Sequence, residues 1–101
     1  MSFRIEVSDR ASAQIRVAAR WWVDNRSKAP GAFAEEVERA FELLSVLPST
    51  GEPVLHPRLY GLRRIFLARV RYHLYYTVSP EAEAVEVLSL WHASRGSTPV
   101  L

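Results

Sequence analysis

The stretch 69–78, RVRYHLYYTV, most tightly constrains the fold, because its polar and apolar side chains alternate with the period of a β-strand. One face of this strand carries the apolar side chains Val70, Tyr72, Leu74, Tyr76 and Val78. The other face carries the polar side chains Arg69, Arg71, His73, Tyr75 and Thr77. A sheet with one apolar face has to bury that face, so the rest of the chain must supply a covering layer.

Two helical segments are expected to form that layer. Apolar residues at helical spacing predict a first helix over about 9–25, capped by Ser8 or Asp9. A second apolar stripe predicts a helix that begins near Pro30 and ends at Pro48. The short break between them predicts an antiparallel αα-hairpin.

Four strands are expected, over 3–7, about 60–68, 69–78 and about 84–91, and the segment 48–58 is expected to be a loop. The element order predicts an α+β fold, β-α-α-β-β-β, with the helical hairpin on one face of a mainly antiparallel sheet. The last strand is apolar on both parities, which favours an interior position with the first strand beside it. Residues 1–101 are interpreted as a single domain.

Charge is segregated along the chain although the net charge is only +2. Residues 53–80 contain no Asp or Glu, and twelve of the 13 basic residues are Arg, whose planar fork suits phosphate or carboxylate. The alternation places the cations on the face opposite the helices, where Arg63 or Arg64 must join them. Trp91 is expected in the core, with His92 facing the other way and Arg95 closing the patch. This face is either simply solvated or a site for an anionic partner.

The outer face carries groups that metal-free RNA cleavage requires. His73 or His92 can move protons near neutral pH, Arg side chains can stabilise developing negative charge, and Tyr75 can stack on a base. The sequence has no cysteine and no P-loop, dinucleotide fingerprint, HExxH or GxSxG motif, so we predict neither a cofactor nor a metal. It also has no signal-peptide pattern or membrane-length apolar run, so we expect a cytoplasmic protein without a membrane partner.

The chain resembles the RelE/ParE superfamily of toxins from bacterial type II toxin–antitoxin systems, especially its ParE-like, plasmid-stabilisation branch. The stretches that carry the resemblance are WWVDNRSKAPGAF, LPSTGEPV, GLRRIFLARVRYHLYYTV and VEVLSLWHASRG. The resemblance implies a small toxin neutralised by a cognate antitoxin, a short protein with a DNA-binding half and a C-terminal segment that wraps the toxin. Operator DNA is then contacted only through the antitoxin, whose apolar anchors and acidic groups we expect against the toxin and its segment 63–71.

The resemblance leaves the target open. ParE-like relatives imply inhibition of DNA gyrase, whereas RelE-like relatives imply metal-free cleavage of mRNA on the ribosome, and a third reading is an inactive toxin kept as an antitoxin partner. RelE-like sites often use a pair of lysines, but this sequence has only Lys28. If the protein is a nuclease, the catalytic candidates are Arg69, Arg71 and His92, with Glu52 as an accompanying carboxylate. The binding candidates are Arg63, Arg64, Arg69, Arg71, His73, Tyr75 and Arg95.

Overall fold

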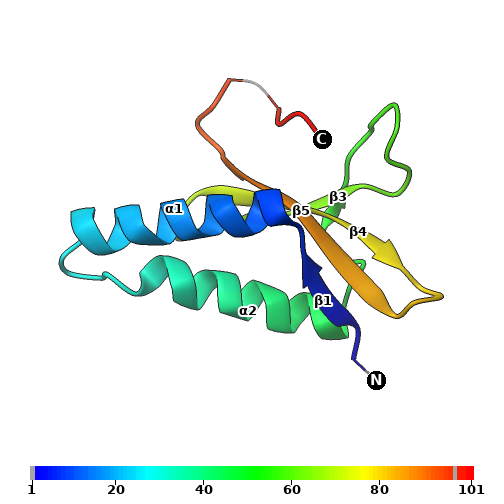
Figure 1. Cartoon of the computed structure of the whole chain (residues 1–101), viewed down its shortest axis with the longest axis horizontal. Helices are drawn as coiled ribbons and strands as arrows, with labels where there is room; N and C mark the ends of the chain where they lie inside the picture. The colour runs from blue at the N-terminus through cyan, green and yellow to red at the C-terminus, as the bar shows by residue number, and fades with distance from the viewer. Residues whose placement is uncertain (1, 97) are drawn as a thin grey trace.

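The computed structural model describes residues 2–96 and 98–101, which form two helices and one five-stranded sheet (Figure 1). The elements follow in the order β1 (Arg4–Val7), α1 (Asp9–Asn25), α2 (Ala32–Val46), β2 (Glu52–Pro53), β3 (Arg63–Leu67), β4 (Tyr72–Ser79) and β5 (Ala84–His92). The strand order across the sheet is β1-β5-β4-β3-β2. Only the β1–β5 pair is parallel, so the sheet is mainly antiparallel and β5 is an interior strand. The predicted α+β fold and the pairing of the first strand with the last are confirmed.

The helical hairpin begins and ends close to where local chemistry predicts. Ser8 caps α1, and its Oγ accepts a hydrogen bond of 3.1 Å from the backbone N–H of Ala11. Helix α2 begins at Ala32, two residues after Pro30, and ends at Val46, before Pro48. Both helices lie along the same side of the sheet (Figure 1), where they cover its apolar face.

The core lies between the helices and the apolar face of β4. Leu74 and Tyr76 are both 0% exposed, and Tyr72 packs at the margin of the same cluster. Ala18 and Phe33 meet them from α1 and α2 respectively. Burial of a large apolar side chain contributes about 1.5–3 kcal/mol, so the predicted inward parity of β4 accounts for much of the stability of the fold.

The chain reverses where the sequence analysis had placed continuous strand. Strand β3 ends at Leu67 and β4 begins at Tyr72, so residues 68–71 form the turn between them. Arg69 and Arg71 are therefore turn residues, and the prediction that they belong to the outer face of a strand is wrong. The prediction failed because it put two antiparallel strands end to end and left no residues for the reversal.

A second difference concerns the segment expected to be a loop. Glu52 and Pro53 form the short edge strand β2, which pairs with Arg64 and Arg63 of β3. The sheet thus has a fifth strand. Its pairing places the Glu52 carboxylate beside Arg64, which belongs to the stretch 53–80 that has no acidic residue of its own. Within the described part of the chain, neither helix combines the length and the apolar character needed to cross a membrane.

Candidate functional site

The side of the sheet opposite the helices, here called the open face, collects a row of polar side chains. Glu52 lies opposite Arg64 in the register, and Arg64 lies opposite Tyr75, so all three point to the same side. Arg64 Nε donates a hydrogen bond to Glu52 Oε1, and Arg64 Nη1 donates one of 3.2 Å to the Tyr75 hydroxyl. The hydrogen bonds with Tyr75 and Glu52 raise the pKa of Arg64. The open face therefore holds a fixed guanidinium with a carboxylate already bound to it.

A second row of rings follows on the open face. His73 lies opposite Phe66 on one side and opposite Trp91 on the other. Its ring centroid is 5.1 Å from that of Phe66 and 6.2 Å from that of Tyr75. Burial lowers the pKa of His73, and the positive charge of Arg64 lowers it further. Both effects favour the neutral imidazole, which is the form in which a histidine can act as a general base.

The chain end closes this face. The guanidinium carbon of Arg95 lies 4.5 Å from the ring centroid of Trp91, in a cation–π contact. Together with Arg64, His73, Tyr75 and His92, these two residues line a hollow of about 210 Å³, here called the open-face hollow. Four of the predicted binding residues, Arg64, His73, Tyr75 and Arg95, are thus brought together at one place. Tyr75 is only 2% exposed, so the prediction that its ring is free to stack on a base is wrong.

Arg63 does not join them. It pairs with Tyr76 on the helix side of the sheet, where its Nη1 donates to the carbonyl oxygens of Ser49 at 3.1 Å and Gly51 at 2.7 Å. Adjacent strand residues point to opposite sides, so Arg64 on the open face forces Arg63 to the other. Arg63 therefore holds the loop before β2 rather than widening the cationic patch.

The expected orientations of Trp91 and His92 are reversed. Trp91 lies opposite His73 on the open face, whereas His92 lies opposite Tyr72 on the helix side, with ring centroids 4.8 Å apart. The register of β4 and β5 shifts between Tyr75 and Tyr76, which skips Leu88. Before the bulge the odd-numbered residues Val85 and Val87 face the core, and after it the even-numbered Leu90 does. Because β5 is apolar at odd and even positions alike, its sequence pattern does not reveal the bulge.

The turn arginines line a different cavity, here called the α1–turn hollow. It has a volume of about 470 Å³, and its lining residues are Trp21, Trp22, Arg26, Arg69, Val70, Arg71, Tyr72 and His92. Arg26 places its guanidinium carbon 5.0 Å from the ring centroid of Trp21 and 5.4 Å from that of Trp22. The three catalytic candidates Arg69, Arg71 and His92 thus meet here, although His92 also lines the open-face hollow with His73 and Tyr75.

The α1–turn hollow contains residues that sequence reasoning did not select. Arg26 follows Trp22 by four residues, so both lie on one side of the end of α1. The spacing is visible in the sequence, but the loop at 25–28 had been interpreted only as a break. Arg69 is engaged by α2, since its Nη1 lies 3.8 Å from Glu35 Oε2 and its backbone N–H donates to Glu36 Oε1 at 3.2 Å.

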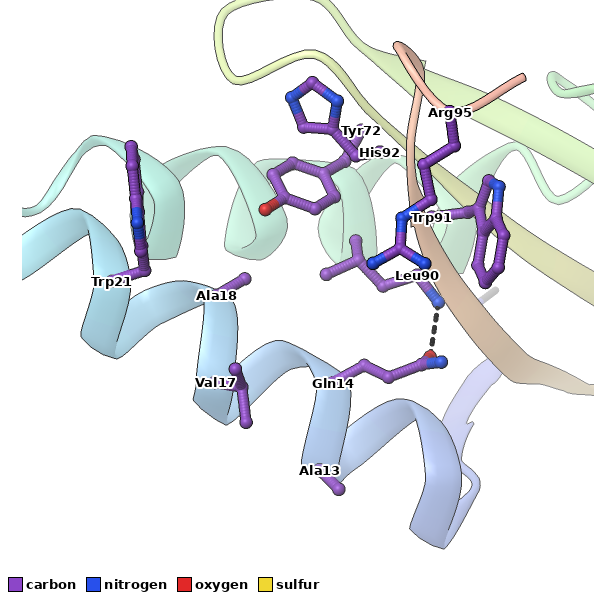
Figure 2. A pocket seen from close by; sticks show the side chains of 10 residues that line it. All are labelled: Ala13, Gln14, Val17, Ala18, Trp21, Tyr72, Leu90, Trp91, His92 and Arg95. Carbon is purple, nitrogen blue, oxygen red and sulfur yellow. Dashed lines mark hydrogen bonds between the residues drawn. The ribbon is translucent and has the colours of Figure 1, made fainter. Parts of the chain in front are cut away.

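An apolar groove, here called the α1 groove, continues from this hollow along the helix (Figure 2). Its volume is about 400 Å³, and it shares Trp21, Tyr72 and His92 with the α1–turn hollow. Gln14 closes its far end, where its Oε1 accepts a 2.8 Å hydrogen bond from the backbone N–H of Leu90. Figure 2 shows Val17 and Trp21 projecting from one side and the end of β5 forming the other.

Comparison with known proteins decides the family. Residues 5–96 match the family model of the ParE toxin of the type II toxin–antitoxin system parDE. The chain belongs to the ParE toxin family. The resemblance to the RelE/ParE superfamily that was noted in the sequence is thereby confirmed. No curated protein matches the toxin.

Solved structures similar to the toxin come from the same kinds of system. The chromosomal ParDE system from P. aeruginosa gives a TM-score of 0.69 at 15% identity, covering 91% of the toxin and 97% of that chain. The RelBE2 toxin–antitoxin complex from Mycobacterium tuberculosis gives 0.63 at 25% identity, with coverage of 91% and 99%. The isolated E. coli RelE toxin gives 0.60 at 21% identity, with coverage of 93% and 87%. The first and third likenesses support the fold alone.

The toxin therefore presents two separate sets of candidate groups. The open face has a carboxylate, a guanidinium, an imidazole and a phenol in contact, which suits either proton transfer or binding of an anion. The α1–turn hollow has guanidinium groups beside indole rings, which suits binding but lacks a carboxylate among its lining residues. Among residues 2–96 and 98–101, no group of three or more His, Cys, Asp or Glu side chains is arranged to hold a metal ion.

Proposed function

We propose that the toxin arrests bacterial growth by inhibiting DNA gyrase and that a cognate antitoxin neutralises it. The observation that carries the proposal is the match to the ParE toxin family over residues 5–96, which covers nearly the whole chain. Gyrase inhibition is a binding function, so it needs exposed recognition groups rather than an assembled catalytic centre. We expect it to take place in the cytoplasm, where gyrase works.

The positions of the nuclease candidates support this choice. Arg69 is paired with Glu35, and His92 turns its ring toward Tyr72. Nδ1 of His92 accepts a 3.1 Å hydrogen bond from the backbone N–H of Ser94. A nuclease site made of Arg69, Arg71 and His92 lacks Glu52, which lies with Arg64 on the open face, and the carboxylates that contact it, Glu35 and Glu36, are engaged by Arg69.

A second candidate, metal-free cleavage of mRNA on the ribosome, is favoured by one observation. Glu52, Arg64, His73 and Tyr75 form a connected group on the open face, with the types of side chain that RNA cleavage uses. Arg64 has to release Glu52 and bind a substrate phosphate before it can stabilise the negative charge that develops during cleavage. In this alternative the catalytic residues are those of the open face, whose hollow His92 also lines, rather than the turn residues Arg69 and Arg71.

Two assays on the same purified toxin separate the candidates. The first follows supercoiling of plasmid DNA by gyrase, and the second follows a translation reaction by primer extension on the mRNA. Loss of supercoiling with intact mRNA supports gyrase inhibition, whereas cuts in phase with codons support the nuclease. If neither occurs while the antitoxin still binds tightly, the toxin is an inactive relative retained as an antitoxin partner.

Variants sharpen the result. Under the gyrase proposal, His92→Ala keeps its toxicity in a growth assay, because no proton transfer by His92 is needed. Under the nuclease alternative, Arg64→Ala and Glu52→Gln each abolish the cuts, because each removes one member of the connected group. Arg16→Ala is the matched control, since Arg16 is an exposed arginine of α1 that lines none of these three cavities.

A further inference from the structure

The backbone at Arg71 is held in a conformation that suits glycine. Its φ is 66°, in the left-handed region that a residue with a β-carbon adopts only at an energetic cost. Two backbone hydrogen bonds hold it there: its N–H donates to the carbonyl of Leu67, four residues earlier, at 2.7 Å, and its carbonyl accepts from the N–H of Ala93, which is distant in sequence, at 2.8 Å. Strain of this kind is typical of positions where the side chain has a task. A glycine would relax the turn but would remove the guanidinium.

That guanidinium borders the α1–turn hollow opposite the end of α1. Arg26 comes from the helix, and Arg69 and Arg71 come from the turn. Neither Arg26 nor Arg71 forms an ion pair with another residue of the described ranges 2–96 and 98–101, whereas Arg69 is paired with Glu35. The hollow therefore contains two guanidinium groups without a counter-ion, one on each of two elements.

The size of this charge surplus selects the kind of anion. Glu35 and Glu36 both contact Arg69, so the cations next to α2 are already balanced. A nucleic-acid strand needs a run of uncompensated cations along several phosphates, which this site does not have. Two guanidinium groups beside indole rings match a single carboxylate, which Arg binds through its planar fork.

The adjoining α1 groove indicates what accompanies the carboxylate. Ala13, Val17 and Trp21 recur every four residues along α1 and form a stripe about 12 Å long. Val17 is 71% exposed and Trp21 is 44% exposed, so both offer apolar surface to a partner. Because the groove and the hollow share Trp21, Tyr72 and His92, one ligand can occupy both (Figure 2).

We propose that the α1–turn hollow is a carboxylate-binding site for the antitoxin. A segment of the antitoxin lays apolar side chains along Val17 and Trp21 and places an Asp or Glu carboxylate between Arg26 and Arg71. The apolar anchors supply most of the affinity, and the carboxylate fixes the register of the segment in the groove. The proposal rests on the proposed function only in requiring a cognate antitoxin, and it is independent of which target the toxin attacks.

The test compares two glycine substitutions at positive φ. The probe is the full-length antitoxin encoded by the reading frame next to the toxin gene, titrated calorimetrically onto each toxin variant. Arg71→Gly should raise the Tm by about 4–8 °C, because it relieves backbone strain, and weaken binding about 10- to 100-fold through loss of a charged hydrogen-bonding group. Glu83→Gly is the matched control, since Glu83 has a φ of 50° in the turn before β5 and is absent from the groove and the hollow. It should raise the Tm and leave the affinity unchanged.

A second variant and a second probe complete the design. Arg26→Gln should weaken antitoxin binding in the same range, because it removes the other side of the clamp. Wild-type affinity in Arg71→Gly, or an equal loss of affinity in Glu83→Gly, overturns the proposal. So does a labelled single-stranded DNA 20-mer whose binding depends on Arg71 when antitoxin binding does not. None of these titrations contains gyrase or ribosomes, so a wrong target assignment leaves their result unaffected.

Discussion

The hydroxyl of Tyr76 anchors the loop between α2 and β2 to the core, and its removal gives the most direct test of how the site is positioned. Tyr76 is 0% exposed. Its hydroxyl donates a 2.8 Å hydrogen bond to the Pro48 carbonyl and accepts one of 2.8 Å from the Gly51 N–H. Burial raises the pKa of Tyr76, so the hydroxyl keeps its proton and its donor role at physiological pH.

Tyr76→Phe deletes both hydrogen bonds while keeping the ring. A buried backbone group left without a partner costs about 1–3 kcal/mol; since the Gly51 contact is buried and the Pro48 contact is partly buried, the two losses together should lower the free energy of unfolding by about 3 kcal/mol. For a domain of this size that loss corresponds to a decrease in Tm of roughly 12–24 °C. The loop carries Glu52 to its position opposite Arg64, so amide exchange at Gly51 and Glu52 should also accelerate.

The assay is urea unfolding followed by tryptophan fluorescence, with amide hydrogen exchange on the same samples. Tyr60→Phe is the control, because Tyr60 is 101% exposed and loses the same atom without losing a buried partner. It should change the free energy of unfolding by less than about 0.5 kcal/mol. A Tyr76→Phe variant as stable as the Tyr60→Phe control would refute the claim that this hydroxyl fixes the loop.

Three further outcomes follow from the same structure. Gly51→Ala should destabilise the fold by about 1–3 kcal/mol in urea unfolding, because its β-carbon would lie 2.5 Å from the Tyr76 hydroxyl and 2.7 Å from the Arg64 carbonyl oxygen; wild-type stability would contradict this close approach. Leu74→Ala should cost about 2–5 kcal/mol, since Leu74 is 0% exposed, and a smaller loss would mean that the core collapses into the cavity. The pKa of His73 is lowered in the folded state, so below its unfolded value of about 6.5 the unfolded chain binds the proton first. Stability should therefore decline as pH falls from about 6.5 toward the folded pKa, and His73→Asn, compared with wild type by urea midpoints, should reduce that decline.

The alternation of 70–78 was sufficient to predict which side of β4 faces the helices, but it did not predict that Tyr75, on the other side, is also buried. Tyr72, Leu74 and Tyr76 lie toward the helices, and His73 and Tyr75 lie on the open face. The same reasoning required one of two adjacent arginines on the open face without saying which. The register supplies the answer, because Arg64 pairs with Tyr75 while Arg63 pairs with Tyr76.

Two features depend on contacts that the local sequence does not encode. The turn at 68–71 has neither Gly nor Pro, and its left-handed residue is fixed by Ala93, a residue that is distant in sequence. The bulge that skips Leu88 exists only in the pairing of β4 with β5. It decides that Trp91, rather than His92, reaches the open face. The sequence alone therefore predicts the two helices and most of the strands, but not the reversal at 68–71, the edge strand β2 or the side chains that face the core after the bulge.

Trp91 and His92 are neighbours in β5 and point to opposite sides of the sheet, yet both of them, like Arg95, line the α1 groove and the open-face hollow. Arg95 stacks on Trp91 in the open-face hollow and also lines the α1 groove (Figure 2). Under the two proposals above, an antitoxin segment in the α1 groove contacts a residue that also closes the open face. An antitoxin segment that displaces Arg95 from Trp91 would therefore alter the open-face hollow, where the nuclease alternative has its catalytic residues. The short segment after β5 is thus a physical link between the two sites.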